Sequence, residues 1–407
     1  MTTIWKTNNP ICKKQYSARQ WIWIMMLLYL VPSFAQRLPR LEVSSNNPHY
    51  LQTSKGKPFF WLGDTGWLLF SKLNREEAIQ YLDDRAQKGF NVLQVMVLHE
   101  LDVTNYDGRP ALIDKDITKP NITRGSNPGN QLAYDYWDHM DFIITQAERR
   151  GIYMALVPIW GDIVKKGVVS TSQAAEYTTW LVKRYRSRSN IIWLNGGDVR
   201  GDQYTIIWDT IGRVIRKYDN QHLIAFHPFG RTSSSWWFQH AEWLDINEFQ
   251  SGHQDYDQDK SEPAYGEDNW KYIRDDYSKL PIKPTLDGEP SYEAIPHGLH
   301  DGNQPYWTAD DVRRYAYWSV FAGGCGFTYG HNAIMQMHKP EDANPAFSVR
   351  EYWNEALNAP GAAQMQYLKK LILSKSFFDR IPDQSILVEP ERLKHGYQAA
   401  TRGEDYA

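Results

Sequence analysis

The sequence has 407 residues, 42% of them apolar, and its 45 basic and 48 acidic side chains nearly balance. A chain of this length buries a large hydrophobic core without needing disulfide bonds. It has no block of Lys and Arg, and phosphate attraction requires such clusters, so we expect no nucleic-acid partner.

The first 35 residues have the pattern of an export signal. They contain four basic residues and no acidic one, an apolar run from Trp21 to Val31, and a small-residue ending at Ala35. This predicts cleavage after Ala35 and an exported protein that is periplasmic, secreted or held at the cell surface. Eleven apolar residues are too few for a bilayer core, which needs about 20, so we expect no membrane insertion. The remaining chain has 41 basic and 48 acidic residues and one cysteine, Cys325.

Eight apolar, β-rich runs follow along the chain and predict eight strands. Near-continuous apolar strands are typical of a sheet that is buried on both faces. The predicted strands cover residues 59–63, 91–98, 152–160, 191–195, 223–227, 244–250, 283–287 and 326–329.

Helical patterns separate these strands. Asn74 with Glu77 three residues later resembles a capping box, which predicts a helix start, and Gly151 suits the end of the next helix. Between the fifth and sixth strands, residues 233–243 leave room for only a short helix.

The alternation predicts a (β/α)8 TIM barrel over residues 36–375, entered by an extended segment at 38–57. An open doubly wound sheet is the alternative, but the turn at residues 63–67 lacks the glycine spacing of that fold. Residues 376–407 contain strand-like stretches at 385–388 and 396–407. We expect them to be the beginning of a small, apparently incomplete C-terminal β domain.

Two acidic residues follow opposite strands of the predicted barrel. Asp198 comes after the fourth strand and two glycines, and Glu289 follows the seventh strand between Gly288 and Pro290. Active sites of this fold lie at the C-terminal ends of the strands. Glycoside hydrolysis needs one protonated and one ionised carboxyl group at one bond, so these two residues are the candidate catalytic pair.

Other polar and aromatic residues near predicted strand ends are candidates for binding a sugar. Acids there also serve as helix caps or loop ion-pair partners, and aromatic rings also pack at a barrel rim. The candidate substrate-binding residues are Asp64, Trp67, His99, Trp160, Asn195, His227, Gln250, His253 and His331. Residues 99–103 do not form a zinc motif, and residues 255–266 lack the glycine and glutamate of a calcium loop. We therefore predict no metal and no cofactor.

Four stretches resemble the apiosidase-like glycoside hydrolases, glycoside hydrolase family 140. They are Phe60-Trp61-Leu62-Gly63-Asp64-Thr65-Gly66-Trp67, Lys88-Gly89-Phe90-Asn91-Val92, Asn195-Gly196-Gly197-Asp198 and Asp287-Gly288-Glu289-Pro290. The resemblance covers about residues 40–375. It implies a clan A barrel that often carries a C-terminal β-sandwich, and hydrolysis of an apiosyl linkage in a pectin side chain. It also implies that Asp198 is the acid/base and Glu289 the nucleophile.

One departure from the wider clan concerns Asn195. In the clan a Glu usually follows the Asn directly, whereas here two glycines separate Asn195 from Asp198. The shorter acid therefore needs a different loop path.

The main hypothesis is a retaining glycoside hydrolase acting on an oligo- or polysaccharide of the plant cell wall. Retention requires carboxyl groups about 5–5.5 Å apart, and inversion about 6.5–9.5 Å. The alternative is a non-catalytic carbohydrate-binding barrel, which would use the same aromatic residues without needing paired acids. A peptidase is disfavoured, because the sequence has neither a zinc motif nor a GxSxG nucleophile elbow. The sugar, the choice between endo and exo attack, and the oligomeric state are open at this stage.

Overall fold

The computed structural model describes residues 1–3, 37–130, 132–388 and 393–407. The predicted cleavage site and the apolar run of the export signal lie outside the described residues. Contacts divide the chain into two units, Met1–Arg37 and Leu38–Ala407, and the second contains the fold. No helix in the described part of the chain combines the length and apolar character that a membrane crossing requires.

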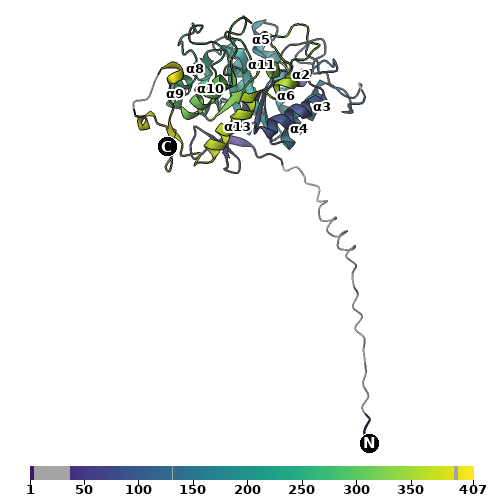
Figure 1. Cartoon of the computed structure of the whole chain (residues 1–407). Helices are drawn as coiled ribbons and strands as arrows, with labels where there is room; N and C mark the ends of the chain where they lie inside the picture. Colours follow the sequence, from purple (N-terminus) through teal and green to yellow (C-terminus); the bar gives the residue numbers. More distant parts are fainter. Residues whose placement is uncertain (4–36, 131, 389–392) are drawn as a thin grey trace. The chain divides into compact units, whose positions relative to one another are not determined.

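Eight parallel strands form a barrel, which confirms the predicted fold (Figure 1). Backbone amides of Asp245 and Ile246 close the circle by donating to the carbonyl oxygen of Ile224, at 2.9 and 3.2 Å. A short strand, β9 (Thr232–Ser233), pairs antiparallel with the sixth barrel strand. The barrel strands are β4 (Trp61–Thr65), β5 (Val92–Met96), β6 (Tyr153–Val157), β7 (Ile191–Val199), β8 (Ile224–Pro228), β10 (Asn247–Gln250), β11 (Thr285–Asp287) and β12 (Gly326–Tyr329).

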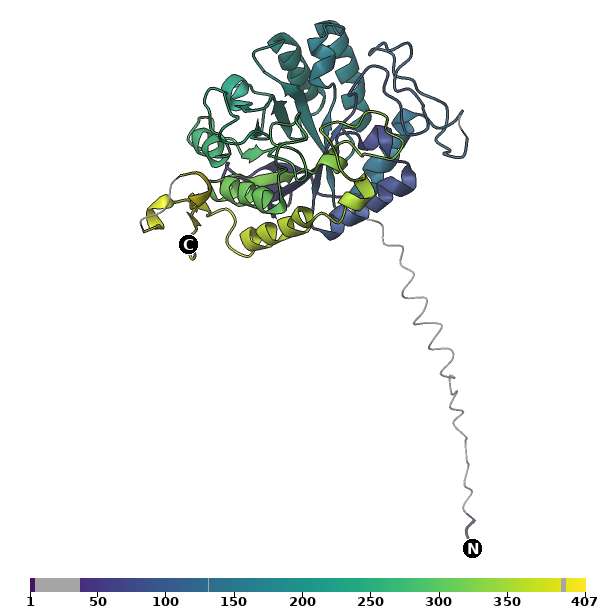
Figure 2. The same cartoon turned by 45° about the horizontal axis from the view of Figure 1, so that its top comes forward.

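Helices surround the strands as a ring (Figure 2). The capping box predicted at Asn74 is present, and Gly151 ends its helix with a φ of +78°. The predicted short helix after the fifth strand is also present, as α8. The helices are α2 (Leu69–Lys72), α3 (Arg75–Gln87), α4 (Tyr136–Arg149), α5 (Gly161–Lys165), α6 (Thr171–Tyr185), α7 (Thr205–Tyr218), α8 (Ser235–Phe238), α9 (Trp270–Tyr277), α10 (Ala309–Phe321), α11 (Asn332–Met335), α12 (Trp353–Ala356) and α13 (Pro360–Leu373).

The core has two layers that follow the alternation of each strand. In β7, Ile191 and Trp193 pack outward against the helices, whereas Ile192 and Leu194 pack into the barrel interior. Successive side chains of a strand point to opposite faces, so a strand buried on both sides needs apolar residues at every position. The continuous apolar runs of the sequence reflect this double burial.

Short antiparallel sheets lie at both ends of the second unit. The extended lead-in forms β1 (Leu41–Val43), β2 (Leu51–Thr53) and β3 (Pro58–Phe59). At the other end, β13 (Ile381–Pro382) pairs with β14 (Thr401–Arg402).

The C-terminal segment is joined to the barrel by Arg380. Its buried guanidinium donates to the carbonyl oxygen of Gly324 at 2.7 Å and also to that of Val320. The prediction of a strand at residues 385–388 is wrong, because residues Gln384–Ile386 form a 3-10 turn. This turn is capped by the Asp383 side chain, which accepts from the amide of Ser385 at 3.0 Å and so favours a turn over an extended strand. The predicted boundary at residue 375 between two domains stays a prediction.

Candidate active site

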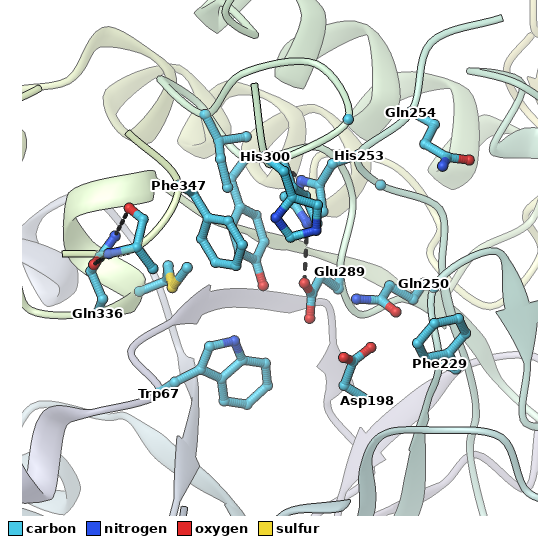
Figure 3. Close-up of a pocket in the computed structure, with 18 of the residues that line it drawn as sticks. Trp67, Asp198, Phe229, Gln250, His253, Gln254, Glu289, His300, Gln336 and Phe347 are labelled. Carbon is cyan, nitrogen blue, oxygen red and sulfur yellow. Dashed lines mark hydrogen bonds and ion pairs between the residues drawn. The ribbon is translucent and has the colours of Figure 1, made fainter. Parts of the chain in front are cut away.

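A cavity of about 540 Å³ opens at the C-terminal ends of the barrel strands. Asp198 and Glu289 point toward one another across its floor, with Trp67 on one side and Phe229 on the other (Figure 3). The two candidate catalytic residues come from β7 and β11, which are separated by β8 and β10, and meet in one space. Six of the predicted residues line this cavity: Trp67, Trp160, Asp198, Gln250, His253 and Glu289.

Two glycines bring Asp198 into the cavity. Gly196 and Gly197 have φ angles of +87° and +115°, and the pairing of β7 with β8 shifts register at this point. A Cβ atom on Gly197 would lie 2.6 Å from the ring of Trp160, so no larger residue fits there. This irregularity of β7 places Asp198 at the cavity, and the carbonyl oxygen of Asp198 accepts a hydrogen bond from Lys165 Nζ at 2.7 Å.

The environment of Asp198 favours its protonated form. Burial raises the pKa of this carboxyl, the negative charge of Glu289 raises it further, and His227 and Lys165 oppose the change, which leaves a pKa of about 6. Asp198 is therefore suited to donate a proton in weakly acidic solution.

The environment of Glu289 favours the opposite state. His253 Nε2 lies 3.1 Å from its Oε1 atom, and His227 Nε2 lies 3.0 Å from its Oε2 atom. Burial alone would raise the pKa of Glu289, but the hydrogen bonds from His227 and His253 and the positive charge of His227 outweigh burial and lower the pKa well below its usual range. Glu289 is thus held ionised, as a carboxylate nucleophile or base must be.

The tautomer of His253 follows from its second contact. Its Nδ1 atom accepts from the backbone amide of Tyr292 at 3.2 Å, so the ring proton sits on Nε2 and is donated to Glu289.

The aromatic residues form the wall beside the two acids. The rings of Trp67 and Trp160 lie 5.4 Å apart, and both face His227, at 5.1 and 5.8 Å. Gln250 adds a polar group whose buried Oε1 atom has no partner within the described residues. An aromatic wall with a few polar groups suits the faces and hydroxyls of a sugar ring.

His227 lies beneath the cavity and does not line it. Its ring is fully buried, with Nδ1 2.6 Å from Glu248 Oε1 and Nε2 3.0 Å from Glu289. The predicted contact of His227 with a sugar hydroxyl is not supported, because carboxylates occupy both ring nitrogens.

Asp64 and Asn195 are buried away from the cavity. The carboxylate of Asp64 accepts from Tyr81 at 2.7 Å and Arg85 at 2.5 Å, which ties β4 to α3. Asn195 donates to the carbonyl oxygen of Trp208 at 2.8 Å and accepts from the amide that follows it. Neither lines the cavity. The structure therefore contradicts the predicted sugar contacts of Asp64 and Asn195, since both side chains serve packing between strand and helix.

His99 and His331 also lie outside the cavity lining. His99 is paired with Glu100 at 3.4 Å. His331 is buried, caps α11 by accepting from the amide of Ala333, and contacts Glu351 at 3.2 Å. Neither histidine faces this cavity, so their contribution to sugar binding stays a prediction.

Sequence reasoning missed part of the lining and its support. Phe229, Tyr292, His300 and Phe347 line the cavity from loops, where no periodic pattern marks them. The buried Glu248 was hidden inside a predicted strand. Its only signal was alternation, because Glu248 lies two positions before Gln250 and thus on the same face. Within the described ranges, no group of three or more His, Cys, Asp and Glu side chains is arranged to hold a metal ion.

Comparisons with known proteins support the family and the fold. The family model described as "Apiosidase-like, catalytic domain" matches residues 45–379. A search of curated proteins finds no match.

Solved structures give two similarities at 45% identity. A glycoside hydrolase family 5 protein from Bacteroides vulgatus ATCC 8482 is similar over 89% of this chain and 78% of its own, with a TM-score of 0.84. A second structure, described only as a glycoside hydrolase, is similar over 90% of this chain and 81% of its own, with a TM-score of 0.84. An endo-1,4-beta-D-mannanase from Thermotoga petrophila RKU-1 is 17% identical over 77% of this chain and 100% of its own, with a TM-score of 0.53, and supports the fold alone.

Proposed function

The chain belongs to the apiosidase-like family and is a glycosidase with a clan A barrel, and from this premise we propose its substrate and its mechanism. The proposed substrate is an apiosyl linkage in a pectin side chain, and the proposed mechanism retains the configuration of the anomeric carbon. The family assignment favours hydrolysis over the non-catalytic carbohydrate-binding barrel.

In the first step Asp198 donates its proton to the glycosidic oxygen while Glu289 attacks the anomeric carbon. The bond to the leaving group breaks, and a glycosyl ester forms on Glu289. In the second step the Asp198 carboxylate takes a proton from water, the water oxygen attacks the same carbon, and Glu289 is released. Trp67, Trp160 and Phe229 provide surfaces for the sugar rings, and Gln250 provides a polar contact.

One observation carries this proposal. Two carboxyl groups face the same cavity in environments that favour opposite protonation states: burial and a neighbouring charge raise the pKa of Asp198 to about 6, whereas hydrogen bonds from two imidazoles lower the pKa of Glu289. This division of tasks is what a two-carboxylate glycosidase needs.

We further propose that the protein is exported, because the signal pattern ending at Ala35 suits a polymer substrate outside the cell. The amino-terminal sequence of protein recovered outside the cytoplasm tests this. A start at Gln36 is expected, and an uncut chain would contradict export by cleavage at Ala35.

The substrate is tested with a panel of pectin oligosaccharides and the chain from Gln36 onward. The released monosaccharide is identified, and its anomeric configuration is followed by NMR during the reaction. We expect apiose with retained configuration. Release of a different sugar would overturn the apiosyl assignment, and an inverted product would overturn the role of Glu289 as a nucleophile.

A further inference from the structure

Glu248 is a fully buried carboxylate directly beneath the proposed catalytic pair. Its Oε1 atom lies 2.6 Å from His227 Nδ1 and 3.3 Å from Gln94 Nε2. It belongs to β10, which pairs with β11, the strand that leads to Glu289. Gly288, on the neighbouring segment, leaves space for Glu248 because it has no side chain. A Cβ atom at position 288 would lie only 2.1 Å from Glu248 Oε1.

The position of His227 between two carboxylates determines which protonation state of its ring is favoured. Nδ1 faces Glu248 and Nε2 faces Glu289, at 2.6 and 3.0 Å. A neutral imidazole has one N–H group, so it can donate to only one of them, whereas the imidazolium donates to both. The geometry therefore favours two ring protons on His227.

Building on the proposed function of Glu289, we propose that Glu248 is a positioning residue for catalysis. It orients His227 and holds it as an imidazolium, and this cation keeps Glu289 ionised and aligned. Glu248 touches no substrate and acts only through His227. His227 was predicted to hold a sugar hydroxyl. We instead expect it to support Glu289 from below the cavity.

Other charged and titratable groups near His227, Glu289 and Glu248 also influence their protonation. Besides the two carboxylates, His227 is near the charge of Asp198 and the rings of Trp67 and Trp160. Glu289 is also bonded to His253, and its charge is felt by Tyr292, whereas Glu248 has Gln94 and the thiol of Cys325 nearby.

Two opposing effects act on the proton between Glu248 and His227. Burial raises the pKa of Glu248, which favours a proton on the carboxyl. Burial also disfavours a charged His227, but the hydrogen bonds and charges of Glu248 and Glu289 outweigh it and raise the pKa of His227 to about 10. The proposal places this proton on His227.

Nitrogen NMR of protein carrying isotope-labelled histidine tests the proposal directly. The ring signals of His227 are assigned by their loss in His227→Asn. In the unaltered protein we expect both ring nitrogens to stay protonated from about pH 5 to pH 8. A neutral His227 at about pH 7 would overturn the proposal, and this measurement depends neither on the identity of the substrate nor on the folding of any variant at position 248.

Glu248→Gln gives the second measurement. Since the amide carries no charge, we expect His227 to lose its second proton at least one pH unit lower. With an aryl apiofuranoside that carries a dinitrophenyl leaving group, the basic limb of kcat/KM should move to lower pH by a similar amount, because Glu289 loses its cationic partner where His227 becomes neutral. Glu248→Asp, which keeps the charge, should restore part of the shift.

Glu293→Gln is the matched control. Glu293 is another buried glutamate, bonded to Tyr329 and to the amide of Gly361, and it faces neither His227 nor Glu289. Its variant should keep the titration of His227 and the pH profile. An unchanged His227 titration in Glu248→Gln would overturn the proposal. If the aryl apiofuranoside is not cleaved at all, the apiosyl part of the proposed function fails, and the NMR result still decides the role of Glu248.

Discussion

The two ends of β8 carry the same chemical pair in different settings. At the N-terminal end, His222 Nδ1 lies 2.6 Å from Asp219, and both side chains are buried. Asp219 also accepts from Trp193 Nε1 at 2.9 Å and from the amide of Gln221 at 3.1 Å. At the C-terminal end, His227 lies 2.6 Å from Glu248, but its other nitrogen faces a second carboxylate that opens onto the cavity.

The two histidine–carboxylate pairs differ in the groups that they contact. Burial would raise the pKa of Asp219, but bonds from His222 and its neighbours outweigh it and lower the pKa, so the pair closes the turn before the strand. At the other end the imidazole also contacts Glu289, which lines the cavity. The Asp219–His222 pair bonds only to neighbouring segments, so we interpret it as structural. The Glu248–His227 pair also contacts a residue of the cavity, so we connect it with the active site.

The largest expected effect comes from breaking the acid pair at the cavity end. Glu289→Gln should lower kcat/KM on the natural linkage by about three orders of magnitude or more, because the amide can neither attack carbon nor form the ester. Asp198→Asn should lose about as much on that linkage, but much less on a dinitrophenyl glycoside, whose leaving group needs no proton. Steady-state kinetics measure both, with thermal unfolding as the control for the fold. Full activity of Glu289→Gln would end its assignment.

The next effect is the dependence of activity on pH. Asp198 must be protonated to act as an acid, and its pKa is raised to about 6, so kcat/KM should fall as pH rises above about 6. The expected loss approaches tenfold per pH unit well above the pKa, and amounts to about fiftyfold between pH 6 and 8. Because the pKa of Glu289 is lowered, no loss from that group is expected on the acidic side near pH 5. A basic limb that persists in Asp198→Asn would contradict this assignment.

A smaller effect is expected at the N-terminal end of β8. Asp219→Asn should lower the free energy of unfolding by about 2 kcal/mol, because His222 loses its charged partner and buried donors lose their acceptor. Denaturant titration measures the loss, while kcat/KM and its pH profile should stay unchanged. A changed pH profile would show that the two ends of the strand are not separate in function.

The smallest effect concerns the rim of the cavity. Phe229 is 44% exposed and lines the cavity, so its ring is free to stack on a sugar. Phe229→Ala should raise KM about threefold to tenfold with little change in kcat, in line with about 1 kcal/mol for one aromatic contact. Tyr367→Ala, at an exposed ring on α13, is the control and should leave KM unchanged. An unaltered KM for Phe229→Ala would remove this ring from substrate binding.

The sequence predicted the barrel well because double burial leaves a strong mark. Continuous apolar runs located all eight barrel strands, and the strand at residues 326–329 has the expected bounds. Capping chemistry is equally local, and Asn74 with Glu77 forms the expected box. The C-terminal segment was harder, since the turn at Gln384–Ile386 depends on a side-chain cap at Asp383 that competes with an apolar pattern.

The site was predicted where position along a strand was enough, and missed where direction mattered. Asp198 lies near the C-terminal end of β7 and Glu289 follows β11, so the topology of the barrel brings them to the same end. Asp64 also ends a strand, but its side chain points outward to Arg85, because one step along a strand reverses the face. Residues on loops, such as Phe347, reach the cavity through contacts between distant segments that no local pattern records.

Gly288 has a consequence for how this protein can change over generations. Its φ is not in the left-handed region, so the backbone itself does not demand glycine there, and the restriction comes from the adjacent Glu248. Any heavier residue at position 288 becomes acceptable only after position 248 has been shortened, and that loss removes the anion beneath the imidazole. The two positions are therefore expected to change together or not at all, although they lie 40 positions apart in the sequence.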